Sequence, residues 1–372
     1  MALLGCAHAD VLPDDRADMM FHRYDGGGII VQGPSVLVQK KFGDHVAFTY
    51  NYYVDHITGH VDTYAGASTD AVSGASTYHE ERTQNSLSVE LLHDKTTYSA
   101  GFINSAEPDF HSKTAFGSVS ESMFGDLTTV SFGFTRGWDR VGERGSTLNA
   151  AADRRNFSVG LSQVLTRDSL LSFNFETSES EGFLNNPYRL VRYVDPTATR
   201  GYSTQQEQYP HTRTGNAGSV EGKYFLPWHA ALDASYRLYN DTWGILAHTG
   251  ELAYTQPLFR SWTLDGHVRL YQQRHATFYS DLFPYADSQN FMARDRELAA
   301  FHSTTIGGGA TWEFHPTRLS WIQKGTVNAR LDRMKIKYSD YRDLSVMGVT
   351  PGTEPEYVLD ASVFQFFISF WF

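Results

Sequence analysis

The chain has 372 residues, a net charge of −11 and a mean hydropathy of −0.39, which are the averages of a soluble protein. No apolar run approaches the roughly 20 residues of a membrane-spanning helix, and the acidic balance argues against nucleic acid as a partner. A single cysteine excludes an internal disulfide framework or a cysteine-bound metal centre.

The N-terminal segment MALLGCAHAD resembles the end of a secretory signal. An A-x-A pattern at 7–9 follows two leucines that fit the end of an apolar core. We therefore predict that 1–9 is the remnant of a signal peptide and that 10–372 forms one mature domain. The segment LLGC has a second interpretation, a lipoprotein cleavage box in which Cys6 carries the lipid.

From about residue 17 the chain repeats one unit: an alternating strand, a tight turn, a second strand and a longer polar loop. Gly, Asp and Pro form the tight turns through positive φ, side-chain capping or fixed φ. The predicted tight turns are 43–44, 93–95, 125–126, 166–168, 227–228, 259–260 and 316–317. The predicted long loops are 59–82, 138–154, 182–214, 276–300 and 340–357.

Within the strands, apolar and polar side chains alternate with a period of two. In 169–178, Phe173 and Phe175 face one side, whereas Asn174 and Glu176 face the other. Short turns at one end and long loops at the other are typical of outer-membrane barrels, whose alternating strands escape a hydropathy average. The aromatic fraction of 14% fits girdles at two membrane interfaces. We predict an all-β, closed antiparallel transmembrane barrel in the bacterial outer membrane.

The predicted turns separate fifteen strands from residue 28 onward. Both ends of such a chain normally lie in the periplasm, which requires an even number of strands. Residues 17–25 supply one more strand, closed by the glycines at 26–28. We therefore predict about sixteen strands; fourteen or eighteen also fit the pattern.

The last strand, 358–372, ends the chain on an aromatic stripe. In a soluble protein such a stripe would be a sticky edge, whereas the closing strand of a barrel presents it to lipid. The alternative is a buried terminal strand in a soluble sandwich. We predict that the barrel-assembly machinery reads the stripe and that its residues face lipid. These residues are Phe364, Phe366, Ile368, Phe370 and Phe372.

Polar strand positions would face the lumen, where charged side chains are candidates for solute selectivity. The same charges have a second interpretation, a ladder of ion pairs that only braces the wall. In the simplest register of the hairpin that turns at 258–260, Glu251 lies opposite His267 and diagonal to Arg269. The candidates are Glu176, Glu221, Asp233, Arg237, Glu251, Asp265, His267, Arg269, Arg330 and Asp332.

Two loops are rich in aromatic and charged residues. Loop 182–214 holds candidates that bind a ligand, narrow the channel or merely order the loop. Loop 276–300 is too apolar for a purely solvated tip, and we expect it to dock against the first loop or a partner. The candidates in the first loop are Asn185, Asn186, Tyr188, Arg189, Arg192 and Tyr193.

Enzyme signatures are poor, since no nucleophile-elbow, zinc-protease, haem-attachment or phosphate-cradling pattern occurs. His22, His45 and His56 would lie near one wall, but nothing in the sequence orients them as metal ligands. We therefore expect no catalytic residue, no metal and no cofactor. A lipid-acting outer-membrane enzyme is the weakest alternative.

Residues 12–55 carry the pattern LPxDRADxxxHRYDGGG and resemble the start of a proteobacterial family of unknown function. The stretches 123–139 and 183–195 look like the same family. The resemblance implies an outer-membrane barrel whose genes neighbour those of a small lipoprotein, a thioredoxin-like protein and a flavin transferase. It therefore suggests a redox-linked envelope system and supplies no catalytic residues.

Two functional classes fit these observations. The first is a porin-like channel for small polar or charged solutes, because about sixteen strands leave a lumen wide enough for water. The second is a structural or partner-binding barrel, a sheath or scaffold within a redox-linked envelope system. The expected partners are outer-membrane lipid, the barrel-assembly machinery and an envelope lipoprotein or redox protein.

Overall fold

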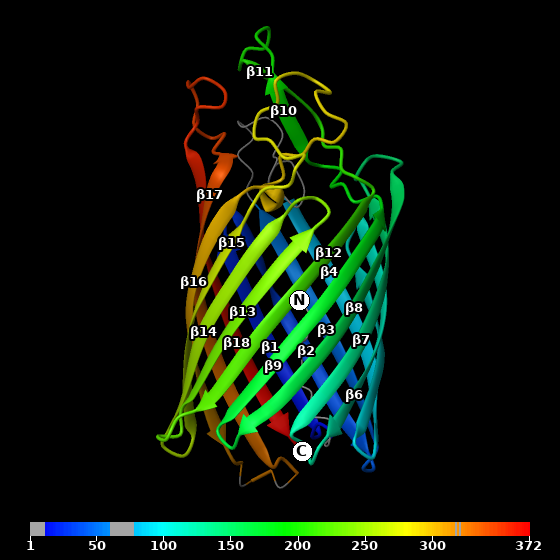
Figure 1. The fold of residues 1–372 in the computed structure, drawn as a ribbon, viewed down its shortest axis with the longest axis vertical. Coiled ribbons are helices and arrows are strands. Elements are labelled where there is room, and N and C mark those ends of the chain that lie inside the picture. Colours follow the sequence, from blue (N-terminus) through cyan, green and yellow to red (C-terminus); the bar gives the residue numbers. More distant parts are fainter. Residues whose placement is uncertain (1–11, 60–77, 317, 320) are drawn as a thin grey trace.

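The computed structural model describes residues 12–59, 78–316, 318–319 and 321–372 (Figure 1). Within them, sixteen antiparallel strands close into one barrel, and a two-stranded hairpin, β10 (Leu190–Val194) with β11 (Tyr202–Gln206), stands beyond one end. The barrel strands are β1 (Arg16–Gly26), β2 (Ile29–Phe42), β3 (Val46–Gly59), β4 (Tyr78–His93), β5 (Thr96–Ala106), β6 (Phe110–Met123), β7 (Thr128–Gly142), β8 (Asn149–Thr166), β9 (Ser169–Gly182), β12 (Thr212–Phe225), β13 (Ala231–Asp241), β14 (Leu246–Leu258), β15 (Trp262–Gln273), β16 (Phe301–Phe314), β17 (Lys324–Arg342) and β18 (Glu356–Trp371).

The barrel closes where the first strand meets the last. Every residue of β1 pairs with β18, from Arg16 opposite Trp371 to Gly26 opposite Ala361. The other edge of β1 pairs with β2 in the same way. Closure leaves no strand edge unpaired, which is the condition for a sheet to span lipid. The predicted fold class, the count of sixteen and the first strand are confirmed.

The two ends of the barrel differ. Six of the seven predicted tight turns lie at one end, with the C-terminus, and this is called the turn end (Figure 1). The seventh, 316–317, includes residue 317, which lies outside the described residues. Several of these turns use the left-handed region, with φ of 66° at Gly43, 52° at Asp94 and 67° at Gly125. The long connections lie at the opposite end, called the loop end.

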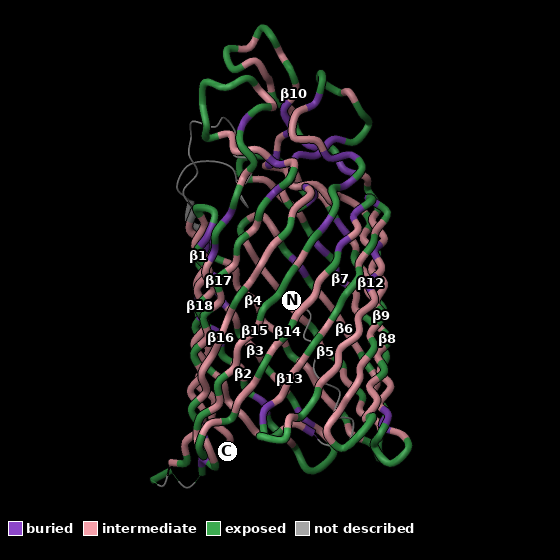
Figure 2. Tube along the Cα trace, turned by 60° about the vertical axis from the view of Figure 1, so that its left-hand side comes forward, coloured by how far each residue is buried: buried purple, intermediate pink, exposed green. Residues whose placement is uncertain are grey.

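The strands present an apolar face outward. Large apolar side chains such as Met19, Leu87 and Phe132 are more than half exposed, although they alternate with half-buried polar neighbours. Figure 2 shows this alternation along the wall and the buried residues gathered at the loop end. Outward apolar surface over the whole wall is the surface that a lipid bilayer requires.

The terminal stripe follows the same alternation. Phe366 lies opposite the exposed Phe21 of β1, and Ile368 lies opposite the exposed Met19. Phe364 and Phe370 share their face, whereas Phe372 follows the last strand residue and its amide donates to the carbonyl of Asp15. The role of the stripe in assembly stays a prediction.

Two further points concern the chain as a whole. Among the described residues, no helix is long and apolar enough to cross a membrane. The predicted signal remnant 1–9, with Cys6, lies outside the described residues.

Candidate functional site in the barrel lumen

The predicted selectivity residues all face the lumen. Each is an odd number of positions from an outward, exposed apolar residue on its own strand: Glu176 follows Phe175, and Asp332 follows Leu331. Since strand side chains alternate, these charged groups point inward. The outward reference residues for the others are Tyr224, Tyr236, Leu252, Leu264, Val268, Leu270 and Leu331.

One group of lumen charges lies on β9, β12 and β13. Arg237 of β13 reaches across β12 to form an ion pair with Glu176 of β9. Toward the turn end, Lys223 lies 2.9 Å from Glu221 and 3.2 Å from Asp233. Both signs of charge are therefore paired along this wall.

A second group spans β15, β16 and β17. The Arg330 guanidinium lies 3.2 Å from Asp265, 3.4 Å from Asp332 and 2.7 Å from Nδ1 of His267. These side chains meet over Gly307 of β16, where a Cβ atom would lie only 1.8 Å from an Asp332 oxygen. A glycine at this position therefore lets groups from the flanking strands touch.

The expected partner of Glu251 is wrong. Glu251 lies opposite Arg269, while His267 lies opposite Ala253. The turn between β14 and β15 has three residues, 259–261, and Phe259 adopts a φ of 56°. The longer turn shifts the pairing by two positions relative to the simplest register.

A third polar cluster was not anticipated. His22 Nε2 lies 2.7 Å from Asp55 Oδ1 and 3.0 Å from the Tyr53 hydroxyl, and Arg82 also binds Asp55. Asp55 is 2% exposed. These hydrogen bonds orient His22, and the sequence could not show them because Asp55 lies on β3, across β2, where only the strand register reveals the contact.

The loop end carries an apolar core inside the mouth. Phe278, Tyr279 and Leu298 of the 274–300 connection pack around Trp243. They rest on inward-facing aromatic and aliphatic residues of the barrel wall. These wall residues are Tyr24, Tyr239, Tyr271, Phe301, Met334, Ile336, Tyr338, Leu359 and Ala361. The 274–300 connection therefore covers the strands from β13 through β18 to β1.

The connections 183–211 and 274–300 form one body, called the outer lid. Isolated bridges join Tyr193 to Phe283 and Gln208 to Met292. Val191, Phe283 and Met292 make a second small apolar core between the two connections. The expectation that loop 276–300 docks against the first loop is confirmed, and Figure 1 shows both beyond the same part of the mouth.

Buried arginines hold the outer lid together. Arg192, 1% exposed, forms ion pairs with Asp281 and with Glu354, the latter at 2.5 Å. Arg294, 0% exposed, lies 3.0 Å from the same Asp281. The Asp281 carboxylate thus joins two guanidinium groups, and Glu354 ties the lid to the connection after β17.

The other predicted loop residues also brace the lid. The Asn185 amide donates to the carbonyl of Glu207 at 2.7 Å, and the Asn186 side chain accepts from the Tyr188 amide at 3.0 Å. Arg189, 6% exposed, forms an ion pair with Asp295. The Tyr188 hydroxyl donates to Asp109 at 2.5 Å. These contacts place the group within and beneath the lid.

Titration in the lid follows burial. Burial raises the pKa of the Glu207 carboxyl, against the opposing effect of the Tyr209 hydroxyl that donates to it at 2.5 Å. Burial and the hydrogen bond to Asp109 raise the pKa of Tyr188 to about 12. Outside the lid, burial likewise raises the pKa of Glu107 in the β5–β6 connection.

Three carboxylates near the mouth could share a cation. Ligand atoms of Glu80, Glu107 and Asp109 lie within 4.8 Å of one another. Arg144 already lies 3.3 Å from Glu80, and Arg82 lies 3.9 Å from Glu107. Two of the three carboxylates thus already have an arginine beside them, and Arg82 also binds Asp55.

A family model described as "Protein of unknown function (DUF3570)" matches residues 6–158 and 147–358. The chain belongs to the DUF3570 family. The match includes the outer lid and every barrel strand except most of β18. Among curated proteins no match is found.

Solved structures resemble this family member in fold. A bacterial polysaccharide outer membrane secretin is 9% identical with a TM-score of 0.50, covering 97% of this chain and 100% of that one. The siderophore receptor PirA from Pseudomonas aeruginosa is 11% identical with a TM-score of 0.43, covering 94% and 62%. Outer-membrane expressed OmpT of Vibrio cholerae is 11% identical with a TM-score of 0.45, covering 98% and 100%.

These likenesses concern the fold alone. The chain spans about three fifths of the length of PirA, since 62% of the receptor is covered. A closed sixteen-strand barrel in the described residues, with an apolar outer wall, makes this DUF3570 protein an integral outer-membrane protein. The turn end is then periplasmic and the loop end extracellular.

Proposed function

We propose that the barrel is a porin-like channel for small polar or charged solutes, narrowed at its outer mouth by the lid. The observation that carries this proposal is the inward orientation of paired charges of both signs on the wall below the lid. Apolar side chains would fill a barrel that excludes water, whereas this wall offers ion pairs and hydroxyl groups to a solvated lumen.

Selectivity in such a channel would come from the wall charges that are not locked in pairs. Glu251 and Arg269 face each other on β14 and β15, and no ion pair joins them within the described part of the chain. Asp265 borders the same wall and already faces Arg330. Charges in a narrow lumen are screened less than those on an open surface, so a single neutralisation changes the local potential that a passing ion meets.

The test is conductance of the purified protein in planar bilayers under a salt gradient. We expect the wild type to conduct and the double variant E251Q/D265N to shift its reversal potential toward anions, because two negative charges leave the lumen. The matched control is Asp153→Asn on the outward face of β8, where Asp153 pairs with Arg136 at 3.1 Å. An unchanged reversal potential in E251Q/D265N would show that these residues only brace the wall.

A second candidate function is a structural or partner-binding barrel of an envelope system. The apolar core and the buried arginines of the outer lid favour it, because both are typical of a closed cover. On this hypothesis the wild type does not conduct, and removing lid residues 185–195 opens the lumen. If neither form conducts, a partner fills the lumen, and co-purification from the native envelope identifies an envelope lipoprotein or redox protein.

A further inference from the structure

The outer surface of β1, β18 and β17 changes from apolar to charged at a defined height. Nearer the turn end, outward rows of the register contain Met19, Ile368 and Val327, then Phe21, Phe366 and Ala329. The next row, Arg23 with Phe364 and Leu331, brings the first charge.

Beyond that row the same face is charged on all three strands. Asp25 and Arg333 flank Ser362 of β18, and Asp360 lies opposite Lys335 of β17. A switch of this kind on three adjacent strands marks the level at which hydrocarbon gives way to lipid headgroups. Because the long loops lie at this end, the headgroups are those of the outer leaflet.

The cations of this patch are incompletely balanced. Arg23 lies 3.0 Å from Asp25, and Lys335 lies 3.8 Å from Asp360. Arg333 is exposed and donates to the Ser362 hydroxyl, and within the described residues no carboxylate lies at ion-pair distance from it. An exposed guanidinium with a free face is suited to bidentate binding of a phosphate group.

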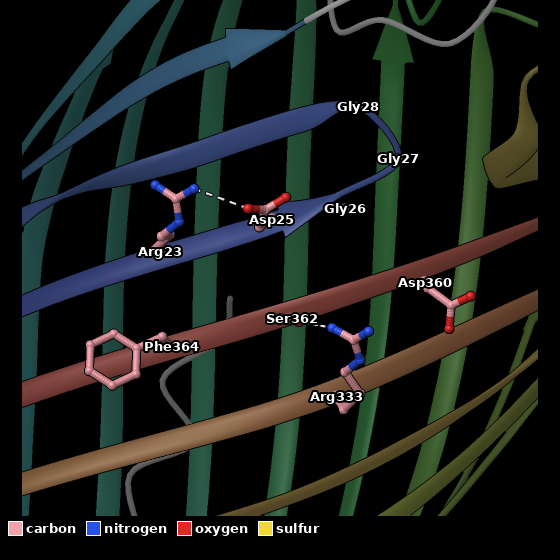
Figure 3. Close-up of a pocket in the computed structure, with 9 residues that line it drawn as sticks. All are labelled: Arg23, Asp25, Gly26, Gly27, Gly28, Arg333, Asp360, Ser362 and Phe364. Carbon is pink, nitrogen blue, oxygen red and sulfur yellow. Dashed lines mark hydrogen bonds and ion pairs between the residues drawn. The ribbon is translucent and has the colours of Figure 1, made fainter.

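A pocket of about 480 Å³ opens between these residues on the outside of the wall. Figure 3 shows Arg23 on β1 and Arg333 on β17, with β18 between them. Asp25, Ser362 and Asp360 line its polar part, and Phe364 lines it toward the apolar belt. The pocket thus has a charged region at headgroup height and an aromatic surface where acyl chains begin.

We propose that this pocket binds the phosphate group of an outer-leaflet lipid, with Arg333 and Arg23 as its cationic anchors and Phe364 against the acyl chains. The outer leaflet of a bacterial outer membrane carries a phosphorylated glycolipid, lipid A, whose phosphate lies at the required height. Basic side chains at a membrane surface attract such headgroups, and each contributes separately to affinity.

Two other outward arginines of the wall do not offer the same site. Arg155 of β8 lies 3.3 Å from Glu179, and Arg136 of β7 lies 3.1 Å from Asp153. Each of these guanidinium groups already has a carboxylate partner. They supply matched controls, because they share the outward face and the charge of Arg333 but lack its free donors.

The test measures lipid retained by the purified protein in detergent, by native mass spectrometry. Diphosphorylated lipid A, its dephosphorylated form and inorganic phosphate are each added to wild type, Arg333→Gln, R23Q/R333Q and the control Arg155→Gln. We expect wild type and Arg155→Gln to retain the phosphorylated lipid. We expect R23Q/R333Q to lose retention about tenfold, with Arg333→Gln intermediate.

Heat modifiability on gels establishes that each variant is folded, and Arg333→Gln keeps the test valid if the double variant does not assemble. Equal retention of dephosphorylated lipid A by the wild type would overturn the proposal in favour of unspecific acyl contact. Inorganic phosphate that displaces the lipid at equal concentration would overturn the lipid assignment. Undiminished retention by R333Q and R23Q/R333Q would overturn the assignment of the two arginines.

Discussion

Arg192 joins three segments of the loop end although its side chain is almost entirely shielded from water. Its guanidinium binds Asp281 of one lid connection and Glu354 of the segment after β17, while its own backbone belongs to β10. A buried charge with two carboxylate partners is costly to break, because removing one member leaves the others uncompensated.

We therefore expect Arg192→Ala to loosen the lid by about 3–5 kcal/mol, since it leaves Asp281 and Glu354 without this cation. The measurement is hydrogen exchange of peptides from 183–211 and 274–300. The control is Arg274→Ala, because Arg274 is an exposed arginine of the 274–300 connection. Equal protection of the lid in both variants would show that the network contributes little.

The buried carboxyl of Glu207 makes the stability of the lid depend on pH. Burial raises its pKa above the ordinary 4.5, so the folded lid holds the carboxyl proton more tightly than the unfolded chain does. This contribution to stability is fully present below the ordinary pKa and is lost as pH rises through the raised pKa.

We expect Glu207→Gln to protect the lid more than wild type at neutral pH and to match it in acid. The Gln carbonyl can still accept from the Arg294 amide, which lies 2.6 Å from the carboxylate in the wild type. Comparing hydrogen exchange of the two proteins at each pH cancels the intrinsic pH effect. Faster exchange in the variant at neutral pH would contradict this sign.

Residue-level roles were only partly predictable. Alternation placed Glu176 and Asp265 in the lumen correctly, because a two-residue period fixes the face of every side chain once one is known. The pairing of His22 with Asp55 was hidden, since it depends on contact between strands that are not neighbours in the sheet. Burial of Arg192 was hidden as well, because loop packing has no sequence period.

At the scale of elements, β16 is notable because two of its inward positions carry no side chain. Its inward positions include Gly307 and Gly309, over which side chains of β15 and β17 meet. Arg330, Asp265 and His267 could not form one cluster across a strand with ordinary side chains there. The glycine run therefore sets the shape of this part of the lumen wall.

We expect Gly307→Val to destabilise the barrel by about 1–3 kcal/mol, because the new side chain meets Asp332 and His267 in a packed space. The measurement is the temperature at which the heat-modifiable form is lost. The control is Gly250→Val on β14, whose Cβ would meet no atom within 4 Å. A smaller loss in Gly307→Val than in the control would refute the packing argument.

The strands and turns were predicted better than the contacts between individual residues. Turn residues with positive φ or side-chain capping marked six short turns, so the strands between them followed, whereas the predicted turn at 316–317 falls in the longer connection between β16 and β17. The hairpin β10–β11 was missed inside its loop, because five-residue strands such as Leu190–Val194 show too few alternations to stand out. The predicted register of β14 against β15 was two positions off, because the turn between them is longer than the simplest register assumes.

At the scale of the whole molecule, the outer lid contacts the rim on two sides, because Tyr188 also bonds to Asp109 of the β5–β6 connection. It packs on strands from β13 through β18 to β1, and its arginines tie it to the connection after β17. This seating is suited to a constriction, because the backbone pairing of β1 with β18 that closes the barrel includes no lid residue.

We expect replacement of 279–292 by a short Gly-Ser linker to increase conductance while the barrel stays heat-modifiable. A short linker suffices because the Ala293 amide donates to the Phe278 carbonyl at 3.1 Å. Replacing 196–200, the tip of the β10–β11 hairpin, by glycines is the control and leaves conductance unchanged. Equal conductance of both variants would show that the lid does not limit the pore.

The pairing of β1 with β18 has a consequence for how the molecule comes into being. Arg16 and Trp371 are partners across nearly the full length of the chain, so this contact has the largest loop-closure entropy of any in the barrel. Contacts between distant residues form slowly, and until this one forms both terminal strands keep open edges. We therefore expect the β1–β18 pairing to be the last to form. The partly assembled sheet, with the phenylalanine-rich β18 at an open edge, is then the state most prone to aggregation.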